Sequence, residues 1–167
     1  MNKTLIAILV FILVVVIAVV FLVKGKVVTI EPNNISQVSS GEKLDLSGQG
    51  LVKVPDYVFN QTELVELNLS NNNLGNALQS QIGNLQNLKV LNLSNNKFTG
   101  VPAEVGHLKN LEILDLSNNL LTGLPNELGN LSKLKILNLS GNNYSEMDLA
   151  GIRKNLPSST VIVTKVQ

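Results

Sequence analysis

Residues 111–133 read LEILDLSNNLLTGLPNELGNLSK, and this stretch decides the fold because it recurs along the chain. Close copies of its first half begin at Leu64, Leu88 and Leu134, and a degraded copy begins at Leu44. Equivalent leucines are spaced by 23, 24, 23 and 23 residues, and they are Leu44, Leu67, Leu91, Leu114 and Leu137. A fixed period of this size predicts a solenoid, in which each repeat buries its apolar face only against its neighbours.

Each repeat combines a strand signal with a helix signal. The apolar-polar-apolar triplet Leu67-Asn68-Leu69 predicts a very short strand with both leucines inward, and a polar run then turns the chain. A Val-Pro or Leu-Pro pair follows in three repeats, and this side of the coil cannot be a regular sheet because proline lacks a backbone donor. The return segment, such as 127–131, has apolar residues three apart, which favours one helical or 3-10 turn.

The pattern Leu-x-x-Leu-x-Leu-x-x-Asn-x-Leu-x-x-Leu-Pro resembles the leucine-rich repeat family, from residue 44 to at least 144. The resemblance implies an α/β solenoid: a short horseshoe with a concave parallel β-sheet and irregular or helical segments on the convex side. The family's asparagine falls on Asn72, Asn96, Asn119 and Asn142, where a side-chain amide can satisfy unpaired backbone groups. Gln79 departs from the pattern, because it occupies the proline position of a repeat that is one residue longer.

The N-terminal part of the chain carries a different signal, an uninterrupted run of 19 apolar residues from Leu5 to Val23. As a helix this run is ~28 Å long, close to the ~30 Å hydrocarbon core of a bilayer. Lys3 precedes the run, and Lys24 and Lys26 follow it. We therefore predict a single-pass transmembrane helix over 5–23, after a short tail of residues 1–4.

Two other interpretations of the apolar run are weaker. A cleaved secretory signal has an apolar region of roughly 7–15 residues and a small-x-small site, which residues 23–25 fit poorly. A buried core helix would need a polar face. The positive charges on the two sides of the run are nearly equal, so they do not set the orientation. A short N-terminal tail followed by one long domain is typical of a signal anchor, and we predict the repeats on the extracellular or periplasmic side. A reversed anchor with cytoplasmic repeats is the alternative.

The repeat region is nearly neutral. The chain has 13 basic and 12 acidic residues, and removing Lys3, Lys24 and Lys26 leaves 10 basic and 12 acidic, a balance of −2. Such a domain has no electrostatic footprint for nucleic acid, which we exclude as a partner. The chain has no cysteine, which excludes disulfides, thiol chemistry and thiolate metal sites.

No residue pattern indicates catalysis. The only histidine, His107, takes the place of Asn84 and Asn130 in the flanking repeats, so we expect it at an exposed convex position. Asp45 and Asp115 lie three repeats apart, too far to share the roughly 6–8 oxygens of one calcium site. No phosphate loop or cluster with metal-ligand spacing occurs in the sequence. We predict no enzyme, no metal and no cofactor.

The candidate binding surface is the outward face of the concave sheet. One predicted outward column contains Lys43, Glu66, Val90, Ile113 and Ile136, and the next contains Asp45, Asn68, Asn92, Asp115 and Asn138. A third column is predicted for Ser47, Ser70, Ser94, Ser117 and Ser140, followed by Asn71, Asn95 and Asn118. This arrangement exposes an apolar strip with a polar rim, the composition of a modest recognition surface.

We predict that the partner contacts lie at Glu66, Asn68, Val90, Asn92, Ile113, Asp115, Ile136 and Asn138. A purely structural origin of the strip stays open, because β-branched residues favour strands and the face lacks the Trp, Tyr and Arg of typical binding hot spots.

The end of the chain is predicted to close the solenoid. A short helix over 148–156 turns Leu149, Ile152 and Leu156 inward, and the 24-residue spacing from Leu137 to Val161 predicts a sixth strand. This element would cover the exposed edge of the last coil.

The predicted organisation is a transmembrane helix at 5–23, a connector and N-terminal cap at 24–43, five repeats at 44–143, and a C-terminal cap at 144–167. Within the connector, Val27 to Ile30 is predicted as a short strand or an edge that packs on the first coil.

The most favoured function is a membrane-anchored, non-catalytic module that binds a protein or peptide at the cell surface. Its predicted partners are a protein or peptide and, through 5–23, the lipid bilayer. The alternative is a structural or self-associating envelope element without a soluble ligand, which would make homotypic contacts.

Overall fold

The computed structural model describes residues 19–23, 26–30 and 43–164, in two compact units, 1–37 and 38–167. In the first unit, β1 (Val19–Val23) pairs antiparallel with β2 (Lys26–Ile30), with Val19 opposite Ile30 and Val23 opposite Lys26. The strand predicted at Val27 to Ile30 is thus confirmed, and its partner is β1. The first eighteen residues and 31–42, on which other predicted N-terminal features fall, lie outside the described residues.

The prediction of a helix over 5–23 is wrong for its last five residues, which form β1. Three of those five are valines, whose branched Cβ favours the extended chain, and β1 pairs with β2 along all five residues. Within the described ranges, no helix has the length and apolarity needed to cross a membrane. Residues 5–18 of the predicted span lie outside these ranges.

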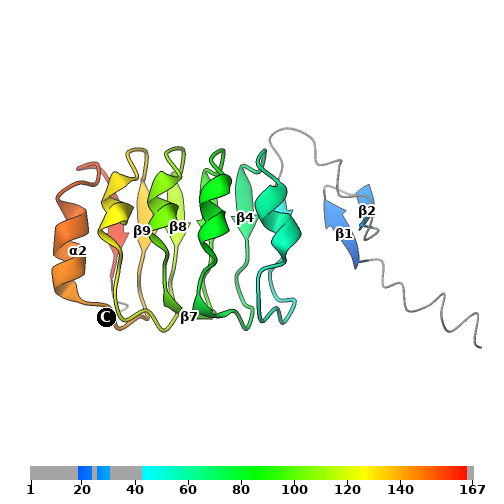
Figure 1. The fold of residues 1–167 in the computed structure, drawn as a ribbon, viewed down its shortest axis with the longest axis horizontal. Helices are drawn as coiled ribbons and strands as arrows, with labels where there is room; N and C mark the ends of the chain where they lie inside the picture. The colour runs from blue at the N-terminus through cyan, green and yellow to red at the C-terminus, as the bar shows by residue number, and fades with distance from the viewer. Residues whose placement is uncertain (1–18, 24–25, 31–42, 165–167) are drawn as a thin grey trace, which may run out of the picture. The chain divides into compact units, whose positions relative to one another are not determined.

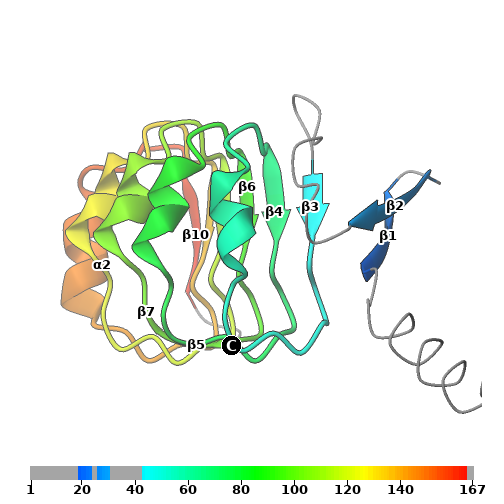
Figure 2. The same cartoon turned by 45° about the vertical axis from the view of Figure 1, so that its right-hand side comes forward.

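The second unit is a solenoid with a six-stranded parallel sheet, as predicted. Its strands, in spatial order, are β10 (Val161–Val163), β9 (Ile136–Asn138), β8 (Ile113–Asp115), β6 (Val90–Asn92), β4 (Glu66–Asn68) and β3 (Lys43–Asp45). Figures 1 and 2 show these strands stacked along one side of the coils and the helices along the other. The strands begin one residue before the predicted triplet, and the residue after each strand extends the ladder: Leu69 N–H donates to Asn92 O at 2.8 Å.

The register places the repeated leucines in one row. Leu44, Leu67, Leu91, Leu114 and Leu137 pair in sequence across the sheet, and all but Leu44 are buried. A second leucine of each coil is equally buried, as at Leu69, Leu93, Leu116 and Leu139. Leucines at these two positions point into the core because side chains alternate along a strand. Each coil therefore contributes apolar surface that only its neighbours can cover.

Short 3-10 helices form the opposite side, as the return segments predicted. They are η1 (Asp56–Asn60), η2 (Ser80–Asn84), η3 (Ala103–His107) and η4 (Asn126–Asn130). Pro55, Pro102 and Pro125 precede three of them with φ of −60°, −72° and −70°. Gln79 takes the same backbone conformation, with φ of −66°, and its Nε2 donates to Val54 O at 2.9 Å.

Adjacent helical turns touch through glycine. A Cβ added to Gly106 in η3 would lie 2.3 Å from the carbonyl oxygen of Glu127, and one on Gly129 would lie 2.9 Å from the Cβ of Asn155. Real Cβ contacts are longer, so any side chain at these positions would push neighbouring coils apart.

The C-terminal coil contains the predicted helix and the predicted strand, but the strand is shifted by one residue in its register. Helix α2 (Glu146–Arg153) begins at Ser145, whose Oγ accepts from Met147 and Asp148 N–H. Leu149, Ile152 and Leu156 are buried. Strand β10 pairs Ile162, not Val161, with Leu137, so this coil is 25 residues long. A small second parallel sheet, β5 (Gly75–Ala77) with β7 (Lys97–Gly100), was not predicted.

Candidate functional site

The first outward column forms a continuous apolar strip. Val90 lies beside Ile113, Ile113 beside Ile136, and Ile136 beside Val161 on β10. Neighbouring strands are about 4.8 Å apart, so the strip spans about 14 Å. Val90 and Ile113 are half-buried, whereas Ile136 and Val161 are 39% and 59% exposed. The structure thus brings three predicted site residues together and adds a fourth.

Val161 and Val163 extend the strip beyond the residues predicted from the sequence. Both lie on β10 and face outward, and Val163 is 37% exposed beside Asn138. The missed signal was the alternation Val161-Ile162-Val163, in which the middle residue takes the inward leucine position. The predicted spacing places Val161 opposite Leu137, a register that would turn both valines inward.

The second outward column has a structural role in ending each strand. Asn68, Asn92, Asp115 and Asn138 each accept, through Oδ1, the backbone N–H two residues later, at distances of 3.1, 3.0, 2.9 and 3.2 Å. This local bond is an Asx turn, which the spacing Asp/Asn-x-Ser could have revealed. These four predicted contact residues therefore offer a partner only their remaining polar atoms.

The serine column is buried in four of its five members, so its prediction as an outward surface is wrong for Ser70, Ser94, Ser117 and Ser140, which are 5–7% exposed. Ser47, in the first coil, is half-buried. The hydroxyl of Ser117 donates to Asp115 Oδ1 at 2.6 Å, and that of Ser94 donates to Asn92 Oδ1 at 2.7 Å. The serines therefore hold the Asx turns and are not available to a ligand.

The asparagines that follow the serines are set by backbone conformation. Asn71, Asn95 and Asn118 have φ between 53° and 57°, and Gly48 and Gly141 take the equivalent positions at 67° and 69°. Asparagine and glycine are the residues that adopt this left-handed region most readily. The column is therefore a requirement of the turn, and only its exposed amides can add to a binding surface.

The interior asparagines form a ladder between coils. The amide of Asn119 donates to Leu93 O and Leu116 O, each at 3.0 Å, and its Oδ1 accepts from Phe98 N–H at 3.0 Å. Asn96 makes the equivalent bonds to Leu69 O, Leu93 O and Leu74 N–H, and Asn72 and Asn142 do so in the outer repeats. Each amide joins two consecutive coils and satisfies backbone groups that the turn leaves unpaired.

Charge lies at the margins of the strip. Glu66 on β4 forms an ion pair with Lys43 on β3, with 2.6 Å between Oε1 and Nζ. Glu112 forms an ion pair with Lys135, with 2.5 Å between Oε2 and Nζ. Hydrogen bonding from Lys135 and its positive charge lower the pKa of Glu112. Partial burial of Asp45 raises its pKa, but hydrogen bonds from Ser47 and Asn68 outweigh this and leave a net lowering. The lowered pKa values of Glu112 and Asp45 favour their ionised forms, which keep the polar rim charged.

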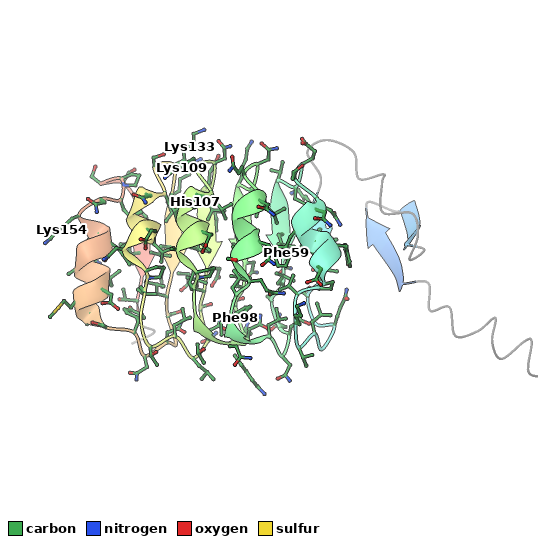
Figure 3. All side chains as sticks on the ribbon, in the orientation of Figure 1. Phe59, Phe98, His107, Lys109, Lys133 and Lys154 are labelled. Atoms are coloured by element: carbon green, nitrogen blue, oxygen red, sulfur yellow. The ribbon has the colours of Figure 1, made fainter. Side chains whose placement is uncertain are left out.

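His107 is exposed on η3, as expected (Figure 3). Among residues 43–164 and the β1–β2 hairpin, no group of three or more His, Asp or Glu could hold a metal ion.

Comparisons with known proteins agree with this architecture. A family model described as a leucine-rich repeat region matches residues 66–158. Among curated proteins, leucine-rich repeat-containing protein 10 of Bos taurus is 47% identical over 55 residues, which cover 33% of this chain and 19% of that protein.

Solved structures of leucine-rich repeat proteins share the fold, among them the following two. A leucine-rich repeat protein of Leptospira interrogans has a TM-score of 0.57 and 35% identity, covering 67% of this chain and 34% of that one. The ectodomain of the plant membrane receptor kinase GASSHO1/SCHENGEN3 from Arabidopsis thaliana, in complex with CASPARIAN STRIP INTEGRITY FACTOR 2, has a TM-score of 0.55 and 27% identity. It covers 68% of this chain and 16% of that chain. The match therefore spans a minor part of each relative.

Proposed function

Because the chain belongs to the leucine-rich repeat family, whose model matches residues 66–158, we propose that its solenoid is a non-catalytic module that binds a protein or peptide on the concave face. The observation that carries this proposal is the exposed strip of Val90, Ile113, Ile136 and Val161. A receptor ectodomain of the same fold, solved in complex with a partner factor, supports it.

The strip defines what a partner must present. Four β-branched side chains in a row, about 14 Å long, fit an apolar segment that lies across the strands. Asn92 flanks the strip, and its Oδ1 is held by Ser94, so its Nδ2 hydrogens are the groups it can donate. A partner segment with apolar side chains and accessible carbonyl groups is therefore complementary to this face.

The test uses the 167-residue chain in lipid nanodiscs and a displayed library of random peptides. Replacing Ile113 and Ile136 together by Glu places two carboxylates where a partner would bury apolar surface. Fully burying one such side chain contributes about 1.5–3 kcal/mol, so we expect the affinity of enriched peptides to fall by at least about tenfold.

The matched control replaces Val52 and Leu120 by Glu, because these residues are 70% and 56% exposed but lie outside the strip. Both variants carry the same added charge. Peptides that bind the Ile113/Ile136 variant as tightly as the unchanged chain would refute the concave-face proposal.

The proposal extends to the membrane. The apolar run from Leu5 to Val23 supports a single-pass anchor that holds the repeats on the extracellular or periplasmic side. It requires Val19–Val23 to be helical in a bilayer, whereas these residues are strand in the structure. Insertion and orientation are therefore tested separately from binding.

Insertion is tested by alkaline extraction of membranes from cells that carry a C-terminally tagged chain. Replacing Leu13 and Val16 by Lys costs roughly 5–7 kcal/mol in a transmembrane helix, and we expect the chain to become extractable. Replacing Asn2 by Lys is the control and should change nothing. External protease should remove the tag if the repeats are outside, and a tag that stays protected until the inner membrane is lysed would place them in the cytoplasm.

A further inference from the structure

The two edges of the large sheet differ in chemistry. Strand β3 presents Lys43 and Asp45, and charged edge strands resist pairing with other strands. Strand β10 consists of Val161, Ile162 and Val163, with no charge and no proline. An apolar, β-branched edge of this kind is a template for another strand.

The backbone of β10 offers hydrogen bonds on its open side. Val161 N–H donates to Lys135 O at 2.8 Å, and Val163 O accepts from Leu139 N–H at 2.7 Å, so both residues bond to the β9 side. In a parallel ladder the N–H and C=O of one residue point to the same side, and successive residues alternate. The N–H and C=O of Ile162 therefore point away from β9, as does the N–H of Thr164.

Helix α2 of the same coil carries a negative charge at its start and positive charges at its end, so two antiparallel copies of it would place opposite charges together. Glu146 lies in its first turn, and Arg153 and Lys154 lie at its end, with the small residue Ala150 between them. These four side chains are exposed and, with Thr164, line an open groove at the end of the solenoid. Figure 3 shows Lys154 extending away from the coils. Asp148 is turned the other way, because its Oδ2 accepts from Leu124 N–H.

We propose that two copies of the chain associate end to end through β10 and α2, about a twofold axis that passes through Ile162 and Ala150. The axis makes the two β10 strands antiparallel, with Ile162 opposite Ile162 of the second copy. Each Ile162 N–H donates to the other's carbonyl, and each Thr164 N–H donates to the carbonyl of Thr160 in the other copy.

The same axis brings the helices together with opposite polarity. Glu146 of one copy faces Arg153 and Lys154 of the other, and the contact occurs twice because a twofold interface repeats every pair. Ala150, at the midpoint, permits the close approach. On the concave face Val161 lies beside Val163 of the second copy, so the two apolar strips become one.

The pairing of charges favours a second copy over a foreign strand at this edge. A peptide of another protein could bond to the backbone of β10, but a single added strand would not supply charges opposite Glu146 and Arg153. Within the described residues these two side chains form no ion pair in the single chain.

The test measures the mass of the 167-residue chain in detergent micelles by sedimentation equilibrium, corrected for bound detergent. We expect a dimer of twice 18.0 kDa. Replacing Arg153 and Lys154 by Glu should raise the dimer dissociation constant at least about tenfold, and adding Glu146→Arg should recover most of the loss. Such recovery cannot come from damage to the fold.

Two further variants locate the interface. Thr164→Pro removes an outward N–H without touching the bonds to β9, and it should also weaken the dimer. Because the chain has no cysteine, Ala150→Cys should form an intermolecular disulfide on mild oxidation. Met147→Cys, 84% exposed on the same helix but off the axis, should not.

Three results would overturn the proposal. One is a monomer at every concentration up to about 100 μM. Another is a dimer that neither the charge reversal nor Thr164→Pro weakens, since it would form elsewhere, such as through the apolar N-terminal run. The third is a monomer that captures a displayed peptide through β10, which would assign the edge to a foreign strand.

Discussion

Replacing Asn119 by Ala tests whether the interior asparagines hold consecutive coils together. The side chain is 5% exposed, its Oδ1 accepts from Phe98 N–H, and its Nδ2 donates to the carbonyl groups of Leu93, Leu116 and Ser117. The substitution removes all four bonds. It leaves a buried N–H without a partner in a coil that is otherwise unchanged.

The expected loss of stability follows from these contacts. A buried donor left without a partner costs about 1–3 kcal/mol, and the two Nδ2 hydrogens, shared among three carbonyl groups, add about 0.5–1.5 kcal/mol each. We therefore expect the free energy of unfolding to fall by about 2–6 kcal/mol. For a small domain this is a large share of the total, because native proteins are stable by only about 5–15 kcal/mol.

The assay is urea unfolding of the 167-residue chain in detergent, followed by circular dichroism and extrapolated to water. Asn73→Ala is the control, because Asn73 is exposed and belongs to the same kind of turn. Asn142→Ala should fall between the two, since Asn142 makes the same type of bonds in a half-buried position. A loss below about 1 kcal/mol for Asn119→Ala, or one equal to the control, would refute the reasoning.

Three other predictions concern the packing of the coils, the ionisation of Tyr57 and the N-terminal cap of helix α2. Gly106→Ala should destabilise by about 1–3 kcal/mol in the same urea assay, because its Cβ would meet the Glu127 carbonyl oxygen, whereas Gly75→Ala should be nearly neutral since nothing lies within 4 Å of that Cβ. Burial raises the pKa of Tyr57 above 10.0, so the stability it contributes is complete below pH 10.0 and is lost as the pH rises through the folded-state value. Unfolding measured across that range should lose less stability in Tyr57→Phe, and an identical loss would exclude this residue as the cause. Ser145→Ala should reduce the free energy of unfolding by about 1 kcal/mol through loss of the α2 cap, and a change in helix content without a change in stability would contradict this.

Much of the solenoid was predictable because its signals are local and repeated. The leucine spacing predicted the strands, the apolar residues three apart in the return segments predicted the 3-10 turns, and the spacing of Leu149, Ile152 and Leu156 predicted the last helix. In each case a residue's own conformational preference agrees with the role it plays in the coil. Five in-phase copies then leave little room for another arrangement.

The candidate site was less predictable, because a column of surface residues can serve either a ligand or the backbone. Asn92 and Ser94 look like binding groups in the sequence, yet they bond to each other and close the turn. Asn118 occupies a turn position with a φ of 53°, a conformation that favours asparagine or glycine and that only the folded backbone reveals. The N-terminal run was read from hydropathy, which does not distinguish a helix in lipid from β-branched residues in a strand.

The sequence by itself determined the repeat and the inward leucines, because side-chain alternation and period act within each coil, and the resemblance to the leucine-rich repeat family implied the parallel sheet. Only the tertiary structure decided which outward side chains remain accessible to a partner and which are used in hydrogen bonds within the solenoid. Hydrogen bonds between coils, joining residues 21–27 apart, use the interior asparagines, and a one-residue difference in the last coil turned Val161 and Val163 outward. These outcomes depend on the register between neighbouring strands, and register is fixed by the packing of whole coils and by no single repeat.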